Sequence, residues 1–175
     1  VRAPRRAAPE RARPQRDGLC GVPQPGKSHR ELDAGRQMAH VMQAAAALTP
    51  EPRIRFAALM HDLGKGRTPR SKWPRHIGHE ESGARLVEAV CERLRVPADY
   101  RELAVLAARW HGLVHRALDL RPRTVLELLE SCDAFRRPER FRELLVACEA
   151  DHRGRGGLAS EPYPQADRLR EAQAR

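Results

Sequence analysis

Apolar residues recur three and four positions apart along most of the chain, which is the periodicity of helices with one buried face. Runs rich in Val, Ile, Thr and Tyr are few, whereas Leu, Ala, Arg and Glu dominate, so the sequence favours an all-α domain. The pattern predicts helices over residues 34–48, 54–63, 79–95 and 98–115, then one from Pro122 to before Pro138 and one from Pro138 to before Gly154.

Three segments differ in composition, and the differences predict the organisation of the chain. Residues 1–17 hold Arg, Ala and Pro with almost nothing to bury, which predicts a disordered basic tail. Residues 18–155 contain the predicted helices and are long enough to bury the core of one domain. Residues 156–175 combine Gly and Pro with a short polar helix that is cut off at Arg175.

One predicted helix carries an adjacent His and Asp at its end. His61 shares a face with the apolar Ile54 and Ala58, so we expect its ring to point toward the core. We expect the helix to stop at Gly64 in the left-handed conformation that favours glycine. A buried imidazole beside the carboxylate of Asp62 is costly unless a cation meets both, and a divalent metal binds both groups. The alternative is a His at a helix C-terminus with a solvated Asp.

The formal net charge is +10, and nearly all of the cations are Arg, because Lys occurs only at Lys27, Lys65 and Lys72. A basic chain of this kind suits an anionic partner such as RNA or phosphate. The predicted loop 64–78 gathers many of these cations around one Trp, so we expect it to face anions.

The four cysteines show no CxxC spacing, and three of them lie on predicted apolar faces. This pattern indicates reduced thiols in the core of a cytoplasmic protein rather than a disulfide framework. No apolar run reaches the length of a membrane span, so no membrane partner is expected.

Several ionisable residues occupy positions on predicted apolar helix faces. His111 and His115 are four residues apart on one face, where both rings can share a metal or a phosphate. Asp133 and Asp151 follow apolar positions on two consecutive helices, where an unpaired Asp is rare. Together with the His-Asp pair, they predict one polar pocket inside a helical bundle.

Each of these residues also has an ordinary structural interpretation. The alternatives are ion pairs of Asp133 with Arg136 or Arg137 and of Asp151 with Arg153 or Arg155, a hydrogen-bonded core position for His111, and loop-surface positions for His76 and His79. A chance placement of all of these residues on apolar faces is less probable than a chance placement of any one of them.

A pocket of this kind supports phosphoester hydrolysis. A divalent ion held by His and Asp activates water and neutralises phosphate oxygens. A cationic shell then stabilises the charge on the phosphoryl group, and the candidates for that shell are Lys65, Arg75, His79 and His111. The pattern gives no support to a nucleophilic Ser or Cys, because none has a base at a recognisable spacing.

Short motifs spread over the chain carry a resemblance to a known family. They are GVPQP at 21–25, HRELDAG at 29–35, RFAAL at 55–59, HDLGKG at 61–66, WPRHIGHE at 73–80 and EADHRGR at 149–155. Together they closely resemble the C-terminal HD domain of bacterial multifunctional CCA-adding enzymes, which are tRNA nucleotidyltransferases. The similarity extends from about residue 18 to the C-terminus.

The resemblance implies an HD-superfamily helical bundle that follows an upstream nucleotidyltransferase head, which carries CCA addition in the family and is missing from this chain. It implies a metal-dependent phosphohydrolase that acts on 2′,3′-cyclic phosphates and 2′-phosphomonoesters. The implied cofactor is Mg²⁺, Mn²⁺, Ni²⁺ or Co²⁺. The implied partners are the tRNA 3′ end or nucleotide phosphates, with a homodimer as a further option.

The sequence and the resemblance together define the expected site residues. The expected catalytic residues are His61, Asp62, Lys65, His79 and His111. The expected metal ligands are His61, Asp62, Asp133 and Gln37. The expected substrate or phosphate ligands are Lys65, Arg75, His76, His115, Asp151 and Arg153.

Gln37 departs from the family, because it stands where the family has its first metal-binding His. A carboxamide is a poorer ligand than imidazole for transition metals, although its oxygen can bind Mg²⁺. His40 lies three residues later, near the same face, and is a partial substitute. Two alternatives to the hydrolase therefore stay open: a catalytically weakened module for tRNA docking or dimerisation, and a free-standing nucleotide phosphohydrolase.

Overall fold

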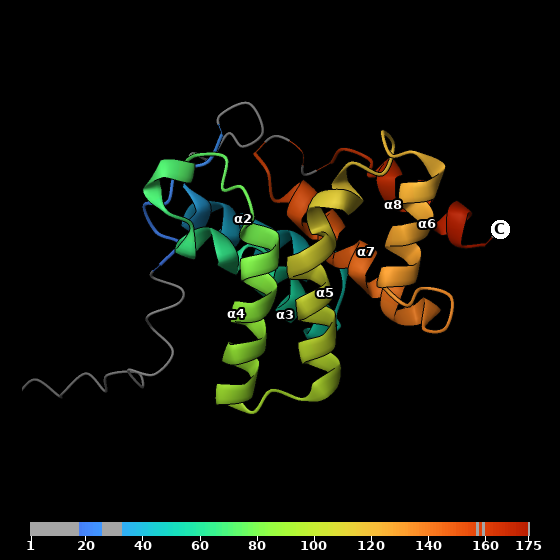
Figure 1. The fold of residues 1–175 in the computed structure, drawn as a ribbon, viewed down its shortest axis with the longest axis horizontal. Coiled ribbons are helices and arrows are strands. Elements are labelled where there is room, and N and C mark those ends of the chain that lie inside the picture. Colours follow the sequence, from blue (N-terminus) through green and yellow to red (C-terminus); the bar gives the residue numbers. More distant parts are fainter. Residues whose placement is uncertain (1–17, 26–32, 157, 159, 175) are drawn as a thin grey trace, which may run out of the picture.

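The computed structural model describes residues 18–25, 33–156, 158 and 160–174, and the predicted tail at residues 1–17 lies outside this part. The described residues form a set of α-helices with two short 3-10 helices, η2 and η3, between α3 and α4 (Figure 1). The elements are α2 (Ala34–Leu48), α3 (Pro52–Met60), η2 (Leu63–Arg67), η3 (Arg70–Lys72), α4 (His79–Leu94), α5 (Ala98–His115), α6 (Pro122–Ser131), α7 (Pro138–Arg153) and α8 (Pro164–Gln173). The predicted all-α fold is confirmed.

Helix α3 is central to the packing, because it contacts α2, α5 and α7. Helices α4 and α5 form a long antiparallel hairpin, α7 packs against α2, α3 and α5, and α6 and α8 lie at one end of the molecule (Figure 1). The core between them is built mainly from Leu, Val and Ala, with Phe141 as its largest fully buried side chain. This aliphatic packing holds the ends of several helices against one another.

The ends of α2 and α5 fall where the sequence predicts them. Helix α2 begins after Asp33, whose side chain accepts a hydrogen bond from the backbone N–H of Arg36 at 2.9 Å, as an N-cap residue does. Helix α5 begins after Pro97 and ends at His115. Local capping and proline positions therefore fix these two helices.

Helix α3 ends at Met60, three residues earlier than predicted, and the chain turns through His61 and Asp62 into η2. The expectation that Gly64 is left-handed is wrong, since Gly21 and Gly78 are the glycines with positive φ among the described residues. Gly64 is instead a point of close approach, because a Cβ added there would lie 2.1 Å from the carbonyl oxygen of His79. The absence of a side chain lets the start of α4 pack against η2.

The C-terminal segment packs onto the same core as the preceding helices. Tyr163, Ala166 and Leu169 are buried in that core, and α8 contacts α5, α6 and α7. Helix α8 is therefore part of the same packing unit as α5, α6 and α7.

Two further observations bear on the expected class of protein. Cys91, Cys132 and Cys148 are buried and free, as predicted for reduced core thiols. Among the residues that the structure describes, every helix falls short of the length and apolarity that a membrane span requires.

Candidate metal centre

Four segments bring a cluster of imidazoles and carboxylates together in the interior. His61 and Asp62 follow α3, His79 is the first residue of α4, His111 lies in α5, and Asp151 lies in α7. Their side chains are at most 12% exposed, and His79 is the most exposed of them. The predicted polar pocket within a helical bundle is thus present, and the alternative of a solvated Asp62 is wrong.

The three imidazoles are oriented by the backbone. The Nδ1–H groups of His61, His79 and His111 donate to backbone carbonyl oxygens of Ala58, His76 and Ala107, at 2.7, 2.9 and 2.9 Å. The Nε2 atom of each ring therefore faces the centre of the cluster. Metal-binding histidines typically donate their second ring nitrogen in this way.

His61 forms one triad with two carboxylates. Its Nε2 lies 3.1 Å from Asp62 Oδ2 and 3.3 Å from Asp151 Oδ1, yet it has no hydrogen-bond partner among the described residues. A lone pair facing two anions is unfavourable unless a proton or a metal cation lies between them. The donor set of one imidazole and two carboxylates fits a divalent cation.

Asp62 also belongs to a second triad, with His79 and His111. Its Oδ1, which has no hydrogen-bond partner among the described residues, lies 3.3 Å from His79 Nε2 and 3.5 Å from His111 Nε2. The two Nε2 atoms are 3.3 Å apart. Ligand atoms about 2.1 Å from a tetrahedral ion lie about 3.4 Å from one another, so the spacing of this triad fits such an ion.

The charges around the two carboxylates are balanced by neighbouring cations. Burial opposes ionisation, but Lys65 and His61 outweigh it and hold the pKa of Asp62 well below its ordinary value. Arg155 and His61 do the same for the pKa of Asp151. Burial also opposes the charge on His61, yet the two carboxylates raise its pKa to about 10. Without a metal, a proton therefore occupies the position between His61 and the carboxylates at neutral pH.

The second carboxylate oxygen of Asp151, Oδ2, is bound by His115 and Arg155. The Nε2–H of His115 donates to Asp151 Oδ2 at 2.6 Å, and its Nδ1 accepts a hydrogen bond from the hydroxyl of Tyr163 at 2.7 Å. Burial lowers the pKa of His115 to about 4 despite the neighbouring Asp151, so the ring stays neutral. His115 was predicted as a phosphate ligand, but both of its nitrogens are engaged by the protein. It positions Asp151 instead.

The expected metal ligand Asp133 lies outside the cluster, and this prediction is corrected. Its carboxylate is 3.4 Å from Arg136, 3.7 Å from Arg137 and 3.8 Å from Arg140, and it joins neither triad of potential ligands. The residue follows α6 with a φ of 54°, which turns it away from the direction that helical spacing predicts. The late carboxylate of the centre is Asp151, which was expected only as a substrate ligand.

Three other predicted substrate ligands have different positions. His76 is buried, and its Nε2 donates to Pro23 O at 2.7 Å while Nδ1 lies 2.5 Å from Thr68 Oγ1, so it fixes the loop. Arg153 pairs with Glu149 at 2.6 Å. Arg75 is exposed on the loop that leads to His79. Of these three, Arg75 alone keeps a guanidinium available to an anion.

Lys65 and Gln37 both contact carboxylates of the centre. The Lys65 ammonium is 2.6 Å from Asp62 Oδ2, and the side-chain amide of Gln37 donates to Asp151 Oδ1 at 2.8 Å. Both also bond to Gln24, a buried residue that is not among the predicted site residues. Gln24 belongs to the GVPQP motif at 21–25, and membership of that motif is the sequence feature that could have identified it as a site residue.

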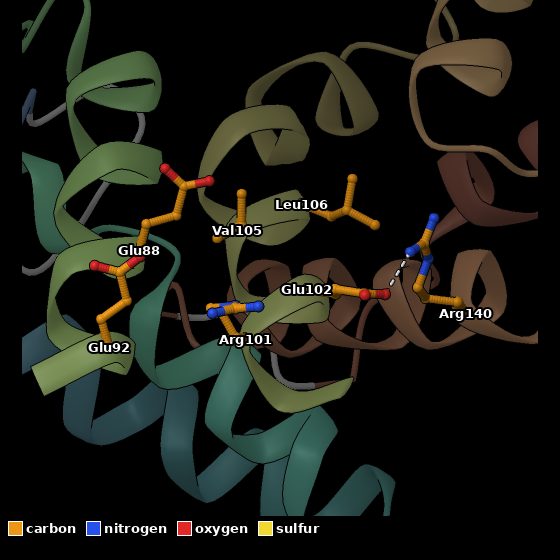
Figure 2. Close-up of a pocket in the computed structure, with 7 residues that line it drawn as sticks. All are labelled: Glu88, Glu92, Arg101, Glu102, Val105, Leu106 and Arg140. Atoms are coloured by element: carbon orange, nitrogen blue, oxygen red, sulfur yellow. Dashed lines mark hydrogen bonds and ion pairs between the residues drawn. The ribbon is translucent and has the colours of Figure 1, made fainter. Parts of the chain in front are cut away.

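A surface groove of about 460 Å³ lies apart from this centre, between α4, α5 and α7 (Figure 2). Its lining alternates in charge: Glu88 and Glu92 project from α4, Arg101 and Glu102 from α5, and Arg140 from α7. Arg140 is bound to Glu102 at 2.8 Å. Because acids surround its cations, this groove is a poor site for a phosphate.

Comparison with known proteins agrees with this geometry. The model of the HD domain family matches residues 37–155, and the chain belongs to that family. HD domains are in general metal-dependent phosphohydrolases.

The chain is also similar to curated proteins named Multifunctional CCA protein. It is 58% identical over 162 residues to the one from Thioalkalivibrio sulfidiphilus, which covers 93% of this chain and 40% of the relative. Identity is 55% to the relatives from Nitrosospira multiformis and Nitrosococcus oceani, over 93% and 90% of this chain. The chain thus spans about 40% of the length of these relatives. No solved structure matches it.

Proposed function

We propose that this domain is a metal-dependent phosphohydrolase that acts on 2′,3′-cyclic phosphates and 2′-phosphomonoesters. The observation that carries the proposal is the convergence of three imidazoles and two carboxylates in the interior, in two triads whose ligand atoms lie within 4.8 Å of one another. His61, Asp62 and Asp151 would hold a divalent cation, which supplies Lewis-acid activation of water and of the phosphoryl group.

The charge of the site supports an anionic substrate. The Asp62 and Asp151 carboxylates are already offset by the Lys65 ammonium and the Arg155 guanidinium, at 2.6 and 2.8 Å. A divalent cation added to this balanced set gives the centre a net positive charge, which a phosphate group neutralises. In this proposal, Lys65 binds a phosphate oxygen in addition to Gln24 and Asp62. His79 is the most exposed ligand candidate, so we propose that substrate approaches from the side of α4.

The two triads differ in the ions that they suit. One imidazole and two carboxylates form an oxygen-rich set, which favours Mg²⁺ or Mn²⁺, whereas Asp62 with His79 and His111 forms a nitrogen-rich set, which favours Ni²⁺ or Co²⁺. The proposed cofactor is therefore a divalent ion of this group. His79 and His111 either hold a second ion or contact the substrate.

The test is hydrolysis of a 2′,3′-cyclic nucleotide by the purified chain with Mg²⁺, Mn²⁺, Ni²⁺ or Co²⁺. We expect turnover that requires metal, is lost in Asp62→Asn, and is retained in Asp133→Asn, a matched control outside the centre. Turnover by the unmodified chain that does not exceed that of Asp62→Asn with any of the ions would refute the enzymatic proposal.

A second candidate function is docking of RNA, and a specific surface favours it. Arg67, Arg70, Lys72 and Arg75 are exposed on the loop between Lys65 and His79. None of the four pairs with an acidic side chain within the described part of the chain. We propose that this loop binds the phosphate backbone near a tRNA 3′ end. We also propose that the protein is cytoplasmic, and that CCA addition is carried out by the region of its relatives that this chain does not span. RNA affinity should then fall steeply with salt, and a salt-independent affinity would contradict docking.

A further inference from the structure

A one-directional chain of hydrogen bonds runs along one side of the metal centre. The Lys65 ammonium donates to Gln24 Oε1 at 2.6 Å, Gln24 Nε2 donates to Gln37 Oε1 at 2.5 Å, and Gln37 Nε2 donates to Asp151 Oδ1 at 2.8 Å. All four side chains are buried, with at most 6% of each residue exposed. Water therefore has little access to replace a broken link.

The two groups at the ends of this hydrogen-bond series, Lys65 and Asp151, fix the orientation of both carboxamides. An ammonium group only donates hydrogen bonds, and an ionised carboxylate only accepts them. Gln24 must therefore turn its oxygen to Lys65 and its NH₂ to Gln37. Gln37 must turn its oxygen to Gln24 and its NH₂ to Asp151. Any single reversal places two buried donors or two buried acceptors against each other.

This orientation decides what Gln37 can do for a cation. A carboxamide ligates metal ions through its oxygen, and the oxygen of Gln37 faces Gln24 rather than Asp151. To become a ligand, Gln37 would have to rotate and present its NH₂ to Gln24. Gln24 would then have to rotate in turn, and its own NH₂ would meet the Lys65 ammonium.

Gln24 is itself anchored by the segment that carries it. Leu19 and Val22 pack in a small apolar cluster with residues of α2. The Val22 carbonyl accepts a hydrogen bond from Ala34 N at 3.0 Å, and the Pro23 carbonyl accepts one from His76 Nε2 at 2.7 Å. The segment therefore offers Gln24 little freedom to withdraw from the chain of bonds.

From this geometry we infer that Gln24 is a positioning residue that prevents Gln37 from ligating the cation. Gln37 then acts as a hydrogen-bond donor that orients Asp151, while His61, Asp62 and Asp151 would hold the ion. This inference rests on the proposed metal site.

The test is Mn²⁺ binding by calorimetry to the unmodified chain, Gln24→Met, Gln37→Met and the double variant. Met preserves the length of the side chain but removes both polar atoms, so Gln24→Met frees Gln37 to rotate and add an oxygen ligand. We expect Gln24→Met to bind Mn²⁺ about tenfold more tightly, and this gain to vanish when Gln37 is also Met. A purely structural role for Gln24 predicts the opposite sign, since loss of packing weakens binding.

The outcomes separate this inference from the proposal on which it rests. Absence of Mn²⁺ binding by the folded, unmodified chain would reject the metal site itself. Binding by the unmodified chain that is unchanged or weaker in Gln24→Met, or a gain that persists in the double variant, would reject the role of Gln24. If Gln24→Met does not fold, Gln24→Glu replaces it, because its acceptor-only carboxylate forces Gln37 to reverse. The gain must then likewise disappear in the Gln37→Met background.

Discussion

Asp133 and Asp151 have similar positions in the sequence and opposite positions in the structure. Both follow apolar residues at helical spacing, both come late in the chain, and both have arginines nearby. Asp151 nevertheless points into the centre with 2% of its side chain exposed, whereas the Asp133 side chain is 31% exposed beside three arginines.

The backbone explains the difference between the two residues. Asp151 lies inside α7, so the helical spacing holds through the residue itself. Asp133 lies beyond α6 and has a left-handed φ of 54°, which breaks the periodicity on which its predicted direction depends. An inward position inferred from spacing is therefore reliable only while the helix continues.

The largest expected effect contrasts the two carboxylates in metal binding. Asp151→Asn removes a ligand from the His61 triad and should weaken Mn²⁺ binding by at least about 100-fold. Asp133→Asn should bind Mn²⁺ like the unmodified chain. Calorimetric titration of both variants measures the contrast. A loss of affinity in Asp133→Asn alone would show that Asp133, and not Asp151, is the metal ligand.

A smaller effect contrasts the arginines that accompany the two residues. Arg155→Met leaves the buried Asp151 without its guanidinium partner, so the free energy of unfolding of the metal-free chain should fall by about 3 kcal/mol. Arg136→Met removes an ion pair whose guanidinium is 83% exposed. The urea concentration at the midpoint of unfolding should therefore be the same for this variant as for the unmodified chain. Equal midpoint shifts would show that burial does not distinguish the two ion pairs.

The smallest expected effect is the release of a proton when metal binds. The pKa of His61 is raised to about 10 in the metal-free chain, so the ring carries a proton at neutral pH that the cation must displace. Metal affinity should therefore rise with pH up to about 10. Titration in two buffers of different ionisation enthalpy should show about one proton released per ion. Zero release at pH 7 would mean that His61 is not a ligand.

The sequence predicted the all-α fold and most helix positions, but α6 ends at Ser131, well before Pro138, where its predicted helix stops. Helices α2 and α5 were predictable because Asp33 and Pro97 mark their starts locally. His61 and His111 were predictable because a polar residue on an apolar face is unusual, and Asp62 because it directly follows His61. The residues that the sequence analysis missed depend on contacts between distant segments. Gln24 meets Lys65 across 41 positions, and no periodicity relates the two residues.

The close approach at Gly64 has a consequence for the size of the centre. The start of α4 rests directly on the backbone of η2, so main-chain contact fixes how far the backbone at His79 lies from the backbone that follows Asp62. Changes in core packing elsewhere can alter stability while leaving this distance the same. Replacing Gly64 by Ala would therefore have to move the start of α4, and with it the backbone that carries His79.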